Sequence, residues 1–216
     1  MNLTTQLSHA RSWVEHTLSY DQNTDVNTFE TTIRMLGGLL SAHYLQEVLH
    51  IVPSDKNTDM YLEKASGLAD RLLGAFDSPS GVPYASVNLH SSQGIPSHAD
   101  SGASSTAEAT TLQLEMKYLA KLTGEAMYWE KAEKVMEVID KNAAKDGLVP
   151  IFINAMTGKF HGSEIRLGSR GDSYYGKNPF VPIFPPSTHG KQNTSSSNTS
   201  KPKRLKKSIK TCTTKQ

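Results

Sequence analysis

Five residues with reactive or unusually small side chains are spaced to lie on one stripe of a predicted helix. They are Glu30, Arg34, Gly37, Gly38 and Ser41, at positions i, i+4, i+7, i+8 and i+11. Two adjacent glycines inside a helix each cost about 1 kcal/mol relative to alanine, which predicts that something approaches this stripe closely. A carboxylate and a guanidinium beside bare backbone are typical of the polar wall of a binding pocket.

The same residues also have a structural interpretation, which the pattern alone favours. Asn27 followed by Glu30 is a capping box at the start of a helix. Glu30 and Arg34 have the spacing of an ordinary i, i+4 ion pair, and glycines also allow helices to pack tightly. The apolar residues that we expect on the buried face recur at helical spacing, at Phe29, Ile33, Leu36, Leu40 and Tyr44.

A specific resemblance favours the functional interpretation. Residues 29–42, Phe-Glu-Thr-Thr-Ile-Arg-Met-Leu-Gly-Gly-Leu-Leu-Ser-Ala, resemble the signature of class I α-1,2-mannosidases, glycoside hydrolase family 47. Residues 82–88, 105–110, 146–154 and 162–175 are similar to the same family. The resemblance implies a Ca²⁺-dependent inverting glycosidase that removes terminal α-1,2-linked mannose from high-mannose N-glycans.

The resemblance also implies roles for three residues. An inverting glycosidase needs a carboxylic acid that protonates the leaving oxygen and a carboxylate that activates water. Glu30 is the implied general acid, and Arg34 is implied to contact the sugar in the cleavage subsite. Glu108, in the Ser105 to Thr110 stretch, is implied to be a further acidic residue of the substrate pocket. The alternative interpretation is that Glu108 is only the capping glutamate of its helix. Asp172 is interpreted as a structural residue at a helix start.

No set of metal ligands is expected within this sequence. The eight histidines lack the spacing of a metal site. The resemblance implies Ca²⁺ as cofactor, held with the help of a threonine that would lie beyond Tyr175. The carboxylate base would also lie beyond Tyr175, and an aspartate-rich helix would precede Met1. We therefore expect the chain to be an incomplete and inactive fragment of the catalytic domain.

The fold class that we predict is all-α, a partial (α/α)7 barrel. Helices are expected over residues 4–18, 26–45, 58–76, 105–122 and 125–141, whereas residues 77–104 are expected to form a long ordered loop. Helical spacing predicts inward faces that include Trp13 in the first helix, Trp129 and Ala132 in the fifth, and in the third Tyr61, Ala65, Leu68, Leu72 and Phe76. Met60 to Ala65 matches Met127 to Ala132 at a spacing of 67 residues. Repeated helical hairpins indicate a toroid in which neighbouring hairpins bury each other's apolar faces, and the resemblance implies the (α/α)7 barrel.

The charge distribution divides the chain. Residues 1–175 carry 14 Lys and Arg against 21 Asp and Glu, whereas residues 176–216 carry nine basic residues and no acidic ones. We predict a partial catalytic domain over 1–175 and a disordered basic tail over 176–216 that is unlike the family. The tail resembles a nuclear import signal at Lys201 to Lys207, yet no nucleic acid is expected as a partner.

The expected location comes from the resemblance. It implies the lumen of the endoplasmic reticulum or Golgi, although no apolar run is long enough for a transmembrane segment and no signal or anchor is visible. The single cysteine, Cys212, cannot form a disulfide within the chain. The alternative function is a non-catalytic, mannose-glycan-binding quality-control protein of the same family, one that delivers misfolded glycoproteins to degradation. Binding of a mannose oligosaccharide without cleavage would identify it.

Overall fold

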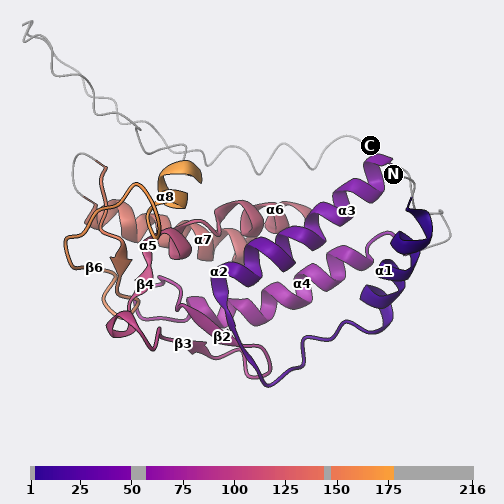
Figure 1. Cartoon of the computed structure of the whole chain (residues 1–216), viewed down its shortest axis with the longest axis horizontal. Helices are drawn as coiled ribbons and strands as arrows, with labels where there is room; N and C mark the ends of the chain where they lie inside the picture. The colour runs from indigo at the N-terminus through magenta and orange to yellow at the C-terminus, as the bar shows by residue number, and fades with distance from the viewer. Residues whose placement is uncertain (1–2, 50–56, 144–146, 178–216) are drawn as a thin grey trace, which may run out of the picture. The chain divides into compact units, whose positions relative to one another are not determined.

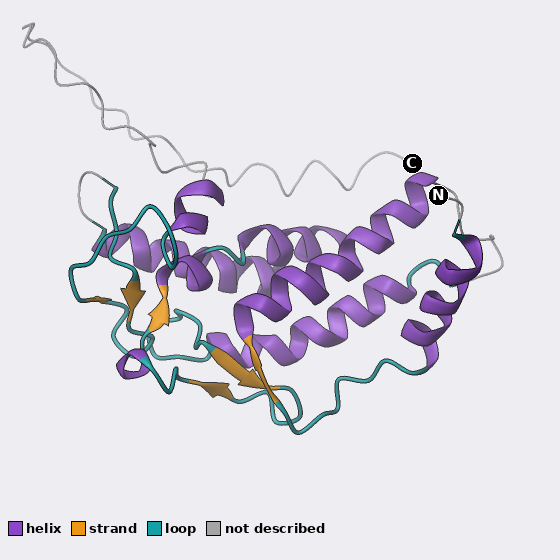
Figure 2. Cartoon of the chain, in the orientation of Figure 1, coloured by secondary structure: helices purple, strands orange, loops and turns teal. Residues whose placement is uncertain are grey.

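The computed structural model describes residues 3–49, 57–143 and 147–177, and most of these residues are helical (Figures 1 and 2). The helices are α1 (Thr4–His16), α2 (Thr28–Thr31), α3 (Gly37–Leu49), α4 (Met60–Leu72), α5 (Thr106–Thr110), α6 (Gln113–Thr123), α7 (Ala126–Asn142) and α8 (Asp172–Lys177). A π-helical segment, η1 (Thr32–Leu36), joins α2 to α3. Two 3₁₀ segments follow later in the chain, η2 (Leu73–Phe76) and η3 (Asp100–Gly102). Residues 178–216, nearly all of the predicted tail, lie outside the described part of the chain.

Two small antiparallel sheets stand at the ends of the helices. One has the order β1-β2-β3 and the other β4-β5-β6, with strands β1 (Asp25–Asn27), β2 (Ser86–Asn88), β3 (Gly94–Ile95), β4 (Ser104–Ser105), β5 (Phe152–Ile153) and β6 (Phe160–His161). The segment predicted to be a long ordered loop, residues 77–104, contains β2, β3 and the first residue of β4, so it is not loop throughout. Because β1 leads directly into α2 and β4 into α5, the sheets fix where these two helices start.

Helical hairpins supply the core. Helix α3 packs beside α4, and α6 packs beside α7 (Figure 1). The sequence repeat marks the same position in both hairpins, since Tyr61 and Ala65 of α4 are buried, as are Tyr128 and Ala132 of α7. The predicted inward face of α4 is confirmed throughout, from Tyr61 to Phe76.

Several predicted inward residues are exposed instead. Helix α1 has no buried residue, and Trp13 exposes 54% of its surface. Trp129 of α7 exposes 46%, with the Lys117 ammonium 4.8 Å from the centre of its ring. Tyr44 exposes 51%, although Leu36 and Leu40 at the same helical spacing are buried. The buried residues of α3 are Leu39, Leu40, His43 and Gln46.

The helix predicted over 105–122 is two helices. The chain departs from helical geometry at Thr111 and Leu112, between α5 and α6. Both residues are buried, so the break lies inside the core rather than at the surface.

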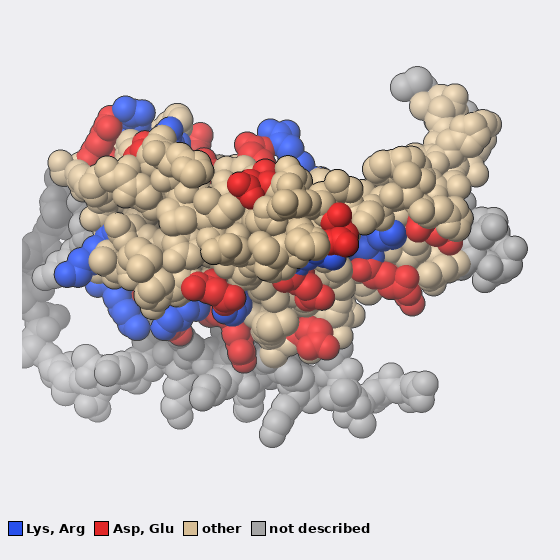
Figure 3. Space-filling model, turned by 90° about the horizontal axis from the view of Figure 1, so that it is seen from below, with Lys and Arg blue, Asp and Glu red and all other residues tan. Residues whose placement is uncertain are grey.

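Acidic and basic side chains are interspersed on the face seen in Figure 3. Among the described residues, no helix combines the length and apolar character needed to cross a membrane.

Candidate active site

Glu30 lies in the first turn of the helix that begins at α2. Asn27 is the N-cap, and its Oδ1 accepts a hydrogen bond from the Glu30 backbone N–H at 2.7 Å. The Glu30 carboxylate contacts Nε of Arg34, one turn along. The N-cap bond of the predicted capping box and the predicted ion pair therefore both form. Because the cap uses only the backbone of Glu30, its side chain, 46% exposed, remains at the surface with Arg34.

A π-helical turn, η1, begins two residues after Glu30 and contains Arg34. Turns of this kind are rare and occur frequently at functional sites. Its first residue, Thr32, is buried and donates through Oγ1 to the Thr28 carbonyl at 2.8 Å. Thr28 in turn donates through Oγ1 to the Tyr84 carbonyl at 2.9 Å. These two bonds anchor the buried side of the helical segment, α2 and η1, that carries Glu30 and Arg34.

The second acidic residue repeats this local design. Ser105 is the N-cap of α5, and its Oγ accepts from the Glu108 backbone N–H at 3.4 Å. The Glu108 carboxylate accepts from Nδ2 of Asn27 at 3.3 Å. The capping interpretation of Glu108 is therefore right about its backbone, while its half-buried carboxylate contacts a residue 81 positions away.

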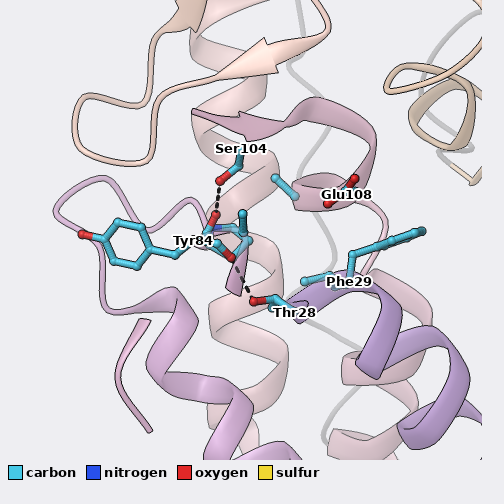
Figure 4. A pocket seen from close by; sticks show the side chains of 9 residues that line it. Thr28, Phe29, Tyr84, Ser104 and Glu108 are labelled. Carbon is cyan, nitrogen blue, oxygen red and sulfur yellow. Dashed lines mark hydrogen bonds between the residues drawn. The ribbon is translucent and has the colours of Figure 1, made fainter. Parts of the chain in front are cut away.

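A small pocket lies between α2 and α5. Glu108 lines it with Phe29 on the same side, whereas the ring of Tyr84 points away (Figure 4). The Ser104 hydroxyl donates to the Pro83 carbonyl at 2.7 Å and closes one side. The other lining residues are Thr28, Ala85, Ala109 and Leu112. The segment around Pro83, predicted to be functional loop, thus forms part of the pocket wall.

The two glycines of the stripe have different surroundings. A Cβ on Gly37 would lie 3.5 Å from Cγ of Glu115 in α6, which is ordinary packing contact. A Cβ on Gly38 would meet nothing within 4 Å. Ser41 donates to the Gly37 carbonyl at 2.7 Å. The packing interpretation therefore fits Gly37, and Gly38 leaves open space on the exposed side of α3.

Arg170 and Asp172 contribute to the setting of α5. Arg170 has φ +72°, a conformation uncommon outside glycine, and its carbonyl accepts from the Ala107 N–H at 2.9 Å. Its guanidinium donates to Asp100 at 3.0 Å and lies 4.8 Å from the centre of the Phe152 ring. Asp172 begins α8, which packs on α5, and accepts through Oδ1 from the Ser173 N–H at 2.8 Å. A single-residue backbone strain of this kind leaves no signal in the sequence.

A Ca²⁺ ion needs six to eight oxygen ligands. Within residues 3–49, 57–143 and 147–177, no three His, Cys, Asp or Glu side chains gather closely enough to hold a metal. The described residues therefore offer no such side-chain cluster for the Ca²⁺ ion that the resemblance implies.

Comparisons with known proteins agree on one family. The model of glycosyl hydrolase family 47 matches residues 1–179. A mannosyl-oligosaccharide 1,2-alpha-mannosidase of Candida albicans is 58% identical over 175 residues, which are 81% of this chain and 29% of that protein. An endoplasmic reticulum mannosyl-oligosaccharide 1,2-alpha-mannosidase of Saccharomyces cerevisiae is 53% identical over 175 residues, 79% of this chain and 31% of that protein.

Among solved structures, an alpha-1,2-mannosidase from Trichoderma reesei superposes with a TM-score of 0.70 at 28% sequence identity. The match covers 80% of this chain and 37% of that one. The chain thus spans 29% and 31% of the length of the two curated relatives named above.

Proposed function

Because this chain belongs to glycosyl hydrolase family 47, with helices that form part of an (α/α)7 barrel, we propose that it provides the acid side of an α-1,2-mannosidase active site. The substrate is a high-mannose N-glycan, from which terminal α-1,2-linked mannose is removed in the endoplasmic reticulum. One observation supports this proposal above the others. Beside a pocket, the Asn27 side chain forms hydrogen bonds with both the backbone of Glu30 and the carboxylate of Glu108.

Glu30 and Arg34 act together in this proposal. Inverting hydrolysis requires a carboxylic acid that protonates the leaving oxygen. The Glu30 side chain is accessible, and its helix is anchored through Thr28, so it can meet the glycosidic oxygen without rearrangement of the backbone. Arg34 uses Nε for Glu30, which leaves its Nη groups to donate to sugar hydroxyls.

Glu108 acts as a sugar-binding acceptor. A carboxylate offers two oxygens, each able to accept more than one hydrogen bond. Oε2 accepts from Asn27, so Oε1 is left for a hydroxyl of the sugar. The apolar side of the pocket, with the Phe29 ring, provides a surface for the sugar's C–H groups. The carboxylate that activates water is not assigned to a described residue.

A graft tests the proposal. Residues 1–175 would replace the matching segment of the Candida albicans relative, and release of mannose from an α-1,2-linked mannose disaccharide would be measured. We expect the graft to be active and Glu30→Gln to lower its kcat by about 10²- to 10⁴-fold, the usual contribution of a general acid. Glu63→Gln is the control, because Glu63 lies in the first turn of α4, as Glu30 lies in the first turn at α2, and a glutamine can still accept from Asn57.

Two results would contradict the proposal. A folded graft without activity would refute the function, and binding of the disaccharide without cleavage would favour the quality-control alternative. An active graft that is insensitive to Glu30→Gln would refute the role of Glu30. The 216-residue chain alone is expected to release no mannose, because an acid without its water-activating base does not complete the inverting reaction.

A further inference from the structure

We infer that Asn27 is a positioning residue of the active site, which holds the carboxylate of Glu108 in register with the helical turn that carries Glu30. Asn27 makes two hydrogen bonds through one amide group. Oδ1 accepts from the Glu30 N–H at 2.7 Å, and Nδ2 donates to Glu108 Oε2 at 3.3 Å. The inference rests on the proposed function, since it gives Asn27 a task in that reaction.

The direction of the Asn27 amide follows from its partners. A backbone N–H can only donate, so the amide atom that faces Glu30 N is the oxygen. The amide nitrogen then faces Glu108, whose ionised carboxylate can only accept. An aspartate at this position would keep the first bond and lose the second, because its carboxylate has no donor. A serine has a single, shorter hydroxyl arm in place of the two amide atoms, so it would keep the first bond and not reproduce the geometry of the second.

Asn27 itself is held firmly. It ends β1, where it pairs with Ser86 of β2, and the next residue donates its backbone N–H to the Ala85 carbonyl at 2.9 Å. Glu108 is held from the other sheet, because its cap Ser105 pairs with Phe152 of β5. The Asn27 to Glu108 bond therefore connects two independently anchored segments, which makes it suited to set the separation of the acidic groups.

The chain contains a matched control at Asn57. Its Oδ1 accepts from the Asp59 N–H at 2.9 Å, and its Nδ2 donates to Glu63 Oε2 at 3.3 Å. The pattern is that of Asn27, but the site is exposed and is not part of the pocket. Asn57→Asp therefore introduces the same chemical change without touching the proposed machinery.

The kinetic test uses substitutions that separate capping from positioning. Asp, Ser and Asn are similarly good N-caps, so a residue that only caps would tolerate Asn27→Asp and Asn27→Ser. Misplacing a catalytic group by about 1 Å can cost about a hundredfold in rate. In the active graft we expect both variants to lower kcat/KM by about tenfold to a hundredfold, with Asn57→Asp unchanged. Wild-type kcat/KM in both Asn27 variants would overturn the inference.

A spectroscopic test uses the full 216-residue chain and needs no activity. The side-chain amide protons of Asn27 should shift when Glu108 is protonated during an NMR titration, and this response should vanish in Glu108→Gln. Amide protons that do not respond to Glu108 would overturn the inference. An inactive wild-type graft, in contrast, would refute the proposed function while this titration still reports on the Asn27 bond.

Discussion

The bond between Tyr128 and Asp70 links the two helical hairpins, and its removal has a predictable effect on stability. The Tyr128 hydroxyl donates to Asp70 Oδ1 at 2.6 Å, joining α7 to α4. Hydrogen bonds to charged groups contribute about 1.5 to 3 kcal/mol, and Asp70 is exposed, so water can replace the lost donor. Tyr128→Phe keeps the buried ring and should therefore lower the free energy of unfolding by about 1.5 kcal/mol.

The same hydroxyl gives the prediction a pH dependence. Burial, the bond to Asp70, and the charges of Asp70 and Glu125 raise the pKa of Tyr128 above its ordinary value of 10. The unfolded phenol therefore ionises first, so this contribution to stability is complete below pH 10 and is lost as the pH rises further. Wild-type protein should lose stability between pH 10 and 11 more steeply than Tyr128→Phe.

Urea unfolding followed by circular dichroism at pH 7 and at pH 10.5 measures both effects. Tyr61→Phe is the matched control, because Tyr61 occupies the equivalent repeat position and no contact to a carboxylate is recorded for it among the described residues. A Tyr128→Phe variant as stable as wild type at pH 7, or with the same loss of stability at pH 10.5, would refute the reasoning.

Three further changes have definite expected outcomes. Gly38→Ala should stabilise the chain by about 0.5 to 1 kcal/mol in thermal unfolding, because the new methyl group meets nothing within 4 Å and alanine favours the helix. Gly74→Ala should prevent native folding, as judged by circular dichroism, because its Cβ would lie 1.6 Å from the Ser92 carbonyl oxygen. Burial raises the pKa of Tyr174 to about 12, so Tyr174→Phe should reduce the loss of stability between pH 10 and 12, measured by urea unfolding.

The helical spacing of apolar residues was sufficient to predict the buried face where one α-helix packs against another. In α4 and α7 the spacing of apolar residues predicted the buried Tyr61, Ala65 and Ala132. Each of these helices is uninterrupted α-helix at these positions, so the face predicted from a 3.6-residue period is the face that packs.

The spacing of apolar residues failed to predict burial where a predicted face is left uncovered. In the central helix Leu36 and Leu40 are buried as predicted, whereas Tyr44, four residues further along α3, is exposed. Trp13 and Trp129 have the spacing of buried helical residues but are exposed. The spacing predicts on which side of the helix a side chain lies, but not whether another element covers that side. Burial at these positions depends on what packs there, which a local pattern cannot contain.

The candidate site shows the same division between local and distant information. Both capping bonds, from Glu30 to Asn27 and from Glu108 to Ser105, lie within three residues and follow from sequence motifs. The bond from Asn27 to Glu108 spans 81 residues and depends on two sheets that bring β1 and β4 to the starts of α2 and α5. A capping motif therefore does not argue against function, because the cap satisfies the backbone N–H and leaves the carboxylate available for a distant partner or a substrate.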